Sequence, residues 1–135
     1  MNPLVPYIWF TGAIHLGIVA MNVPLPSILG YREQLAKVSP IIRQVFIVHS
    51  IYIVLILLGF SALCFWFAPQ LAGESPLGAF LSGCLAVFWG LRLAIQVFYY
   101  DEALKRAHRV VHIVFSMAIG FLTGIFLIAA LRIVQ

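Results

Sequence analysis

Charged side chains are scarce in this sequence, and acidic side chains are the scarcest of all. Only 9% of the 135 residues are charged, and 4 of them are Asp or Glu. A soluble domain has about 25% charged and about 45–50% apolar residues, whereas 64% of this chain is hydrophobic and its mean hydropathy is +1.10. The composition excludes an ordinary soluble domain and favours an all-α integral membrane protein.

Cysteine is almost absent as well. Cys64 and Cys84 lie in separate apolar runs and form no CxxC pair, so neither a thiolate metal cluster nor a thiol-exchange centre is expected. The first residues lack the positive region and cleavage site of a signal peptide, so we expect the first apolar run to be a retained helix. The net charge of +4 comes from basic residues beside apolar runs. Such residues set membrane topology, and no nucleic-acid partner is expected.

Four apolar runs are long enough to cross a bilayer, because about 20 helical residues span its core. We predict one domain, residues 1–135, with spans over residues 4–22, 40–67, 77–100 and 110–131. The pairs Ser39-Pro40 and Ser75-Pro76 are typical helix starts. The segment YREQLAKV, between the first two spans, mixes charged and apolar residues as a short helix on a membrane surface does. The predicted fold is therefore a four-helix transmembrane bundle with a short interfacial helix between its first two spans.

Basic residues occur in the first and third connections and are absent from the second. They are Arg32, Lys37 and Arg43 in the first connection, and Lys105, Arg106 and Arg109 in the third. Short cytoplasmic loops are enriched in Lys and Arg. We therefore expect both basic connections to face the cytoplasm of a bacterial inner membrane and both termini to lie outside, in the periplasm.

Polar side chains lie inside each of the four apolar runs. A rise of about 1.5 Å per residue places five of them about 5–13 Å inside the cytoplasmic edge. A charge at bilayer depth costs at least about 2.5–3.5 kcal/mol, so we expect these side chains to face the bundle interior or a ligand. The candidate cofactor-binding residues are His15, His49, Arg92, Gln96 and His112.

Histidines on different helices of a bundle can ligate a haem iron, and arginines can pair its propionates. We therefore predict a small redox-associated membrane subunit that binds a b-type haem in the cytoplasmic half of the bundle. The iron ligands would be His15 with His49, or His49 with His112, and Arg92 would meet a propionate. In its architecture this arrangement resembles small membrane cytochromes b. The expected role is electron transport within a multi-subunit complex.

Three alternatives use the same residues. A quinone or an anionic headgroup could occupy the layer, because imidazole groups donate to carbonyl oxygens and Arg92 can neutralise a phosphate or carboxylate. A metal ion could bind His108 and His112, which are four residues apart, together with His15 or His49. Finally, the chain could be a non-catalytic accessory subunit of a larger membrane complex, in which Arg92 pairs with a partner's carboxylate.

The third apolar run carries two stripes of residues unsuited to lipid. The small-residue stripe is Ser82, Ala86, Gly90 and Ala94, and the polar stripe is Arg92, Gln96 and Tyr100. The two stripes are offset by about 200° around a helix. A helix of a four-helix bundle normally keeps one outward face. We therefore expect this span to contact other membrane subunits or a second copy of the chain, in addition to lipid.

The fourth apolar run has one stripe that recurs every four residues. Its members are His108, His112, Ser116, Gly120 and Gly124. Small and polar residues mark the packed side of a membrane helix, so this stripe is predicted to face the bundle interior.

Overall fold

The computed structural model describes residues 1–133, which are helical or lie in short turns and contain no strand. The long helices are α1 (Val5–Met21), α4 (Pro40–Trp66), α5 (Pro76–Ala94) and α7 (Arg109–Ala130). The short elements are α2 (Leu25–Ile28), α3 (Tyr31–Ala36), η1 (Gln70–Glu74), η2 (Ile95–Tyr99) and α6 (Glu102–Ala107). The π-helical turn η2 continues α5 without a break.

Three helices in the described part of the chain are long and apolar enough to cross a membrane. They are α4, α5 together with η2, and α7. Helix α1 is equally apolar but has only 17 residues. The three long apolar helices indicate an integral membrane protein.

Polar caps and turns set the ends of these helices. The Ser75 hydroxyl accepts a hydrogen bond from the Gly78 amide at 2.9 Å, which starts α5 by satisfying one of its free N–H groups. The Asn22 side chain donates to the Ile18 carbonyl at 2.8 Å where α1 ends. Gly30 has a φ of 64°, a left-handed conformation that suits glycine and lets the chain turn from α2 into α3.

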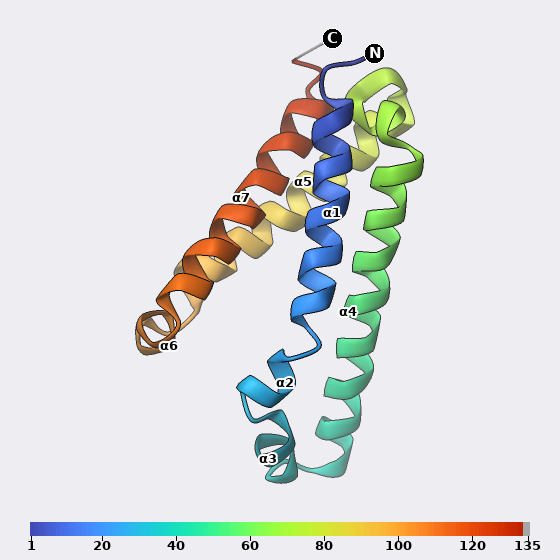
Figure 1. Ribbon diagram of the computed structural model, residues 1–135. Helices are drawn as coiled ribbons and strands as arrows, with labels where there is room; N and C mark the ends of the chain where they lie inside the picture. The colour runs from blue at the N-terminus through green and yellow to red at the C-terminus, as the bar shows by residue number, and fades with distance from the viewer. Residues whose placement is uncertain (134–135) are drawn as a thin grey trace.

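The long helices form two antiparallel pairs, α1 with α4 and α5 with α7. Both termini and η1 lie at one end of the molecule, and the two pairs diverge toward the other end (Figure 1). The shared core lies near the termini. Its largest fully buried side chains include Ile8, His15, Leu71, Ile119, Leu122 and Phe126.

The half of the molecule away from the termini has no common core. In α4 the first buried side chain is that of Leu57, and in α7 it is that of Ile119. The first 17 residues of α4, residues 40–56, are therefore all partly or fully exposed. The four long helices pack together over one half of their length only.

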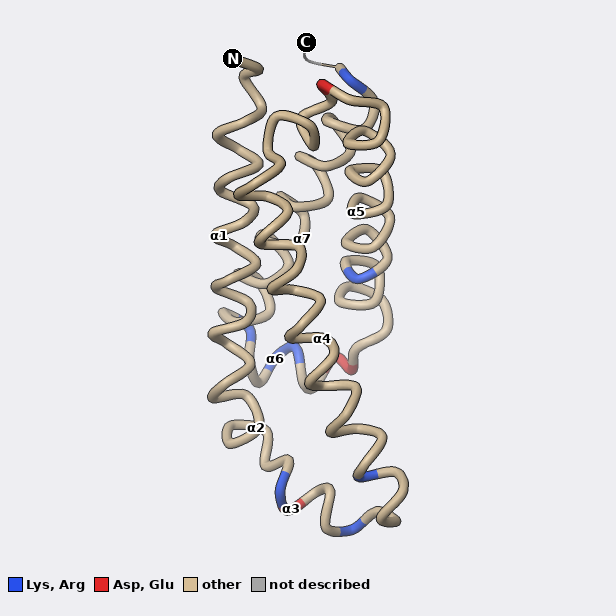
Figure 2. Tube along the Cα trace, turned by 90° about the vertical axis from the view of Figure 1, so that its right-hand side faces the viewer, with Lys and Arg blue, Asp and Glu red and all other residues tan. Residues whose placement is uncertain are grey.

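The two basic connections lie at the open end of the molecule, away from the termini, each on its own helix pair (Figure 1 and Figure 2). Figure 2 shows the Lys and Arg residues of α3 and α6 at the end away from the termini. The loop with η1 and Glu74 lies at the end that carries the termini. Antiparallel helices place the first and third connections at the same end. Which side of a membrane that end faces stays a prediction.

Candidate functional site

A chain of polar side chains joins α5, η2 and α7 toward the open end. Arg92 Nη1 donates to Gln96 Oε1 at 2.9 Å, and Gln96 Nε2 lies 2.9 Å from His112 Nδ1. The guanidinium carbon of Arg92 also lies 5.4 Å from the centre of the Tyr100 ring, within the range of a cation–π contact. Gln96 is 7% exposed. The structure thus brings three of the five candidate residues into one network.

The direction of these hydrogen bonds determines which nitrogen of His112 carries a proton. Arginine can only donate, so the Gln96 oxygen must face Arg92 and the Gln96 amide nitrogen must face His112. His112 Nδ1 therefore accepts, and the neutral imidazole carries its proton on Nε2. A protonated Nε2 donates to an oxygen atom, whereas a metal requires an unprotonated nitrogen. The network therefore leaves His112 Nε2 as a hydrogen-bond donor for an oxygen atom of a ligand.

His112 also lines a pocket beside the network, called here the basic pocket. Its volume is about 660 Å³. The Lys105 ammonium donates to the Val97 carbonyl and lies 3.4 Å from Glu102 Oε1, so one of the basic groups is already partnered. The residues around the pocket are Val97, Glu102, Lys105, Arg106, Arg109, His112 and Ile113. The pocket therefore combines several hydrogen-bond donors with two apolar walls.

Acidic partners near the network are few. Within residues 1–133 the ion pairs are Lys37 with Glu33 at 3.8 Å and Lys105 with Glu102 at 3.4 Å. Arg92 forms no ion pair with any described carboxylate, and its one side-chain hydrogen bond goes to a neutral amide. The described residues leave the positive charge of Arg92 unneutralised. An oxygen-rich or anionic group beside the network would interact favourably with it.

His15 lies in the core, outside this network. Its Nδ1 donates to the Thr11 carbonyl at 2.6 Å, and its Nε2 accepts from the Trp89 indole at 3.2 Å. Its ring centre lies 5.8 Å from that of Phe60, 5.3 Å from that of Trp89 and 6.2 Å from that of Phe126. His15 is 0% exposed, and both of its nitrogens are bonded. In this fold it joins the four long helices as a packing residue.

His49 lies on the exposed half of α4. Its Nδ1 donates to the Val45 carbonyl at 2.8 Å, which leaves the Nε2 lone pair without a partner among the described residues. Phe60, which contacts His15, lies eleven residues further along α4 (from 49 to 60), a rise of about 16 Å. His15 and His49 are thus well separated along the molecule. A lone pair held in this way suits a metal or a donor from outside the chain.

Helix packing does not bring together His49 and His112, the second predicted pair of iron ligands. His49 is on α4 and His112 is on α7, and these helices belong to different pairs that diverge toward their first residues (Figure 1). Within residues 1–133 no group of three or more His, Cys, Asp or Glu side chains is placed to hold a metal ion. His108 is the exposed residue between α6 and α7.

Sequence reasoning missed Trp89, which the structure connects to His15. Trp89 donates to His15, and it lies seven residues before Gln96, a spacing that keeps two residues on one helix face. This spacing from Gln96 is the sequence signal that could have identified Trp89. The Ser116 hydroxyl belongs to the stripe predicted to face the bundle interior. It is inaccessible and has no hydrogen-bond partner among the described residues.

The fold and the network define an all-helical protein with helices able to cross a membrane and a basic, donor-rich site between two of them. No family model matches the chain, and the searches of curated proteins and of solved structures find no similar protein. A functional assignment therefore depends on the residues of this chain.

Proposed function

We propose that this chain is a small redox-associated membrane subunit that binds the ring of a quinone in the basic pocket beside His112. In this proposal α1 is the fourth span, α2 and α3 lie at the membrane interface, and four spans form the membrane domain. The basic end faces the cytoplasm of a bacterial inner membrane, and both termini lie in the periplasm. Other membrane subunits exchange electrons with the bound quinone.

The hydrogen-bond chain from Arg92 through Gln96 to His112 is the observation that carries this proposal. A quinone carbonyl oxygen only accepts hydrogen bonds, and His112 Nε2 is set to donate because Arg92 and Gln96 orient its other nitrogen. Val97 and Ile113 give the pocket apolar walls for a ring. Reduction places negative charge on the quinone oxygens, and Arg109 in the pocket and Arg92 behind His112 favour that charge.

Binding of a short-tailed benzoquinone analogue to the purified protein in nanodiscs tests the proposal. His112→Phe keeps a ring and removes the donor, so we expect affinity to fall about tenfold, the equivalent of about 1.4 kcal/mol for one hydrogen bond. His108→Phe is the matched control because His108 is exposed and outside the pocket, and its affinity should change less than twofold. Titration calorimetry measures both variants.

Three outcomes would contradict the quinone assignment. Equal affinities of the wild type and His112→Phe would remove His112 from the site. Binding of phosphatidylglycerol at the pocket without quinone binding would assign the pocket to a lipid headgroup. A Soret band in protein purified from a haem-replete host would favour haem, which exposed His49 could ligate together with a nitrogen from another chain.

A further inference from the structure

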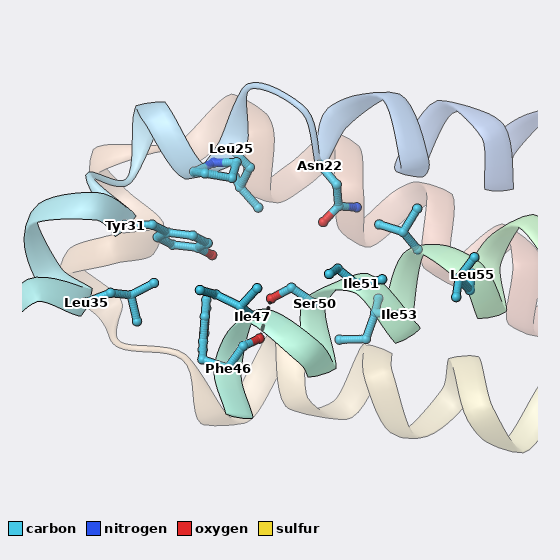
Figure 3. Close-up of a pocket in the computed structure, with 12 residues that line it drawn as sticks. Asn22, Leu25, Tyr31, Leu35, Phe46, Ile47, Ser50, Ile51, Ile53 and Leu55 are labelled. Atoms are coloured by element: carbon cyan, nitrogen blue, oxygen red, sulfur yellow. Dashed lines mark hydrogen bonds between the residues drawn. The ribbon is translucent and has the colours of Figure 1, made fainter. Parts of the chain in front are cut away.

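A second cavity lies on the other helix pair, between α3 and the first half of α4, and is called here the apolar groove. It has a volume of about 610 Å³. The turn after α1, the helix α3 and one face of α4 form its walls, and their side chains point toward one another (Figure 3). Its apolar lining includes Leu25, Leu35, Phe46, Ile47, Ile51 and Val54.

Two side-chain oxygens without a hydrogen-bond partner among the described residues face the apolar groove. The Tyr31 hydroxyl and the side-chain oxygen of Asn22 point into the space between α3 and α4 (Figure 3). The Asn22 amide nitrogen is already used, since it donates to Ile18 O at 2.8 Å. The Tyr31 ring packs edge-on against Phe46, with ring centres 5.3 Å apart. Neither oxygen has a hydrogen-bond partner within residues 1–133, so both are available to a ligand.

A cation is bonded to one of the residues that line the apolar groove. Arg43 Nε donates to the Leu35 carbonyl at 3.0 Å, and Leu35 lines the groove. This bond fixes the guanidinium while its two terminal nitrogens make no hydrogen bond to any described residue. The nearby acid, Glu33, is paired with Lys37 at 3.8 Å. The groove thus combines a cation bonded to one of its lining residues, a tyrosine hydroxyl in its wall and an apolar channel.

The shape of the apolar groove favours a chain-like ligand. The stretch of α4 from Arg43 to Val54 rises about 16 Å, and the groove beside it has a volume of about 610 Å³. A single hydrocarbon chain fits along it.

We propose that the apolar groove holds one acyl chain of an anionic phospholipid, whose ester carbonyl accepts from the Tyr31 hydroxyl and whose phosphate meets Arg43. Anionic lipids gather at basic segments beside membrane helices, with about 1 kcal/mol per Lys or Arg. A neutral amphiphile would leave the Arg43 guanidinium without an anion. The inference relies on the membrane placement proposed above and is independent of the quinone.

Native mass spectrometry of the full chain, released from nanodiscs of equal phosphatidylglycerol and phosphatidylethanolamine, tests this site. We expect one retained phosphatidylglycerol. Ile47→Trp fills the groove and should lower the retained fraction at least tenfold. Ile56→Trp is the matched control, since Ile56 is 44% exposed and outside the groove, and it should retain the lipid.

Two further variants separate packing from recognition. Arg43→Gln should lower the preference for phosphatidylglycerol over phosphatidylethanolamine about fivefold. Tyr31→Phe keeps the ring against Phe46 and removes only the hydroxyl, so it should weaken retention about fivefold without disturbing the fold. Retention in Ile47→Trp equal to that of the wild type, or an unchanged preference in Arg43→Gln, would overturn the proposal.

The same experiment distinguishes this site from the quinone site. His112→Phe should leave phospholipid retention unchanged, and Ile47→Trp should leave quinone affinity unchanged. Loss of quinone binding in Ile47→Trp would show that the two cavities are not separate, and would overturn the assignment of the groove to a phospholipid alone.

Discussion

The three histidines on the long helices, His15, His49 and His112, differ in the nitrogen that their neighbours leave free. His15 has both nitrogens bonded, to Thr11 and Trp89. His49 bonds a backbone carbonyl through Nδ1 and keeps a lone pair on Nε2. His112 accepts from Gln96 at Nδ1 and keeps a proton on Nε2. A histidine in this protein is therefore a packing residue, a hydrogen-bond acceptor or a hydrogen-bond donor, depending on which neighbour bonds its ring.

Removing the partner of His15 should destabilise the core. In Trp89→Phe the ring remains, but the buried His15 Nε2 loses its donor. We expect the free energy of unfolding to fall by about 1–2 kcal/mol, since a buried unsatisfied group costs about that much. Chemical unfolding in detergent micelles, followed by circular dichroism, measures the change.

Trp66→Phe is the control for that substitution. Trp66 is 78% exposed, so the free energy of unfolding should change by less than about 0.5 kcal/mol. If Trp89→Phe and Trp66→Phe had the same stability, the hydrogen bond between Trp89 and His15 would not contribute to the core.

The buried face of α5 and η2 includes residues from both stripes predicted from the sequence. Ser82 belongs to the small-residue stripe and Gln96 to the polar stripe. Ser82, Trp89 and Gln96 are spaced by seven residues, which rotates each one by only about 20° from the last. Residues four apart rotate by about 40° each time, so the stripe from Ser82 to Ala94 winds away from the packed face. Ser82 is buried and Ala94 is exposed. The partner expected at this helix stays a prediction.

Helix α7 shows the same winding. A Cβ atom at Gly120 or Gly124 would have no neighbour within 4 Å, although the four-residue stripe predicted these positions to be packed. Gly90 on α5 faces Thr123 instead, at 3.5 Å from its added Cβ. The buried positions of α7 are Ile119, Leu122, Ile125, Phe126 and Ala129. Large apolar residues, rather than the glycines, make this interface.

The crossing of α1 and α4 depends on a missing side chain at Gly12. A Cβ there would lie 3.0 Å from Cys64 Cβ and 3.2 Å from the Phe65 ring, and the Ser61 hydroxyl donates to the Gly12 carbonyl at 3.0 Å. We expect Gly12→Leu to lower the free energy of unfolding by about 1–3 kcal/mol, the usual effect of overpacking. The same detergent unfolding assay measures it.

Gly17→Leu tests whether that effect belongs to the crossing. An added Cβ at Gly17, on the same helix, meets nothing within 4 Å, so Gly17→Leu should be neutral or stabilising. Equal loss of stability in Gly12→Leu and Gly17→Leu would show that the close approach of α1 and α4 is not what requires glycine.

The whole molecule is built from two helix pairs that share one core. The core lies near the termini, where His15 is surrounded by aromatic rings from α4, α5 and α7. At the other end the pairs diverge (Figure 1), and each carries its own cavity: the basic pocket beside α7 and the apolar groove beside α4. Both proposed sites therefore lie where the pairs no longer pack on each other.

The proposed orientation predicts which loops can be labelled from outside the cell. In a Cys84→Ser background, with Cys64 buried, a membrane-impermeant maleimide should label Glu74→Cys on intact cells. It should label Arg106→Cys only after the cells are opened, because α6 is a basic connection and should face the cytoplasm. Labelling of Arg106→Cys in intact cells, with protection of Glu74→Cys, would reverse the topology.

The sequence by itself determined the helices. The observed starts at Pro40 and Pro76 and the end of α7 at Ala130 lie within one residue of the predicted ones, because hydropathy and Ser-Pro starts are local signals. It also singled out Arg92, Gln96 and His112. The tertiary structure alone decided that these three form a network while His15 enters the core and His49 stays exposed. The reason is physical: side-chain partners depend on helix rotation and divergence, which packing between distant segments sets and local sequence does not.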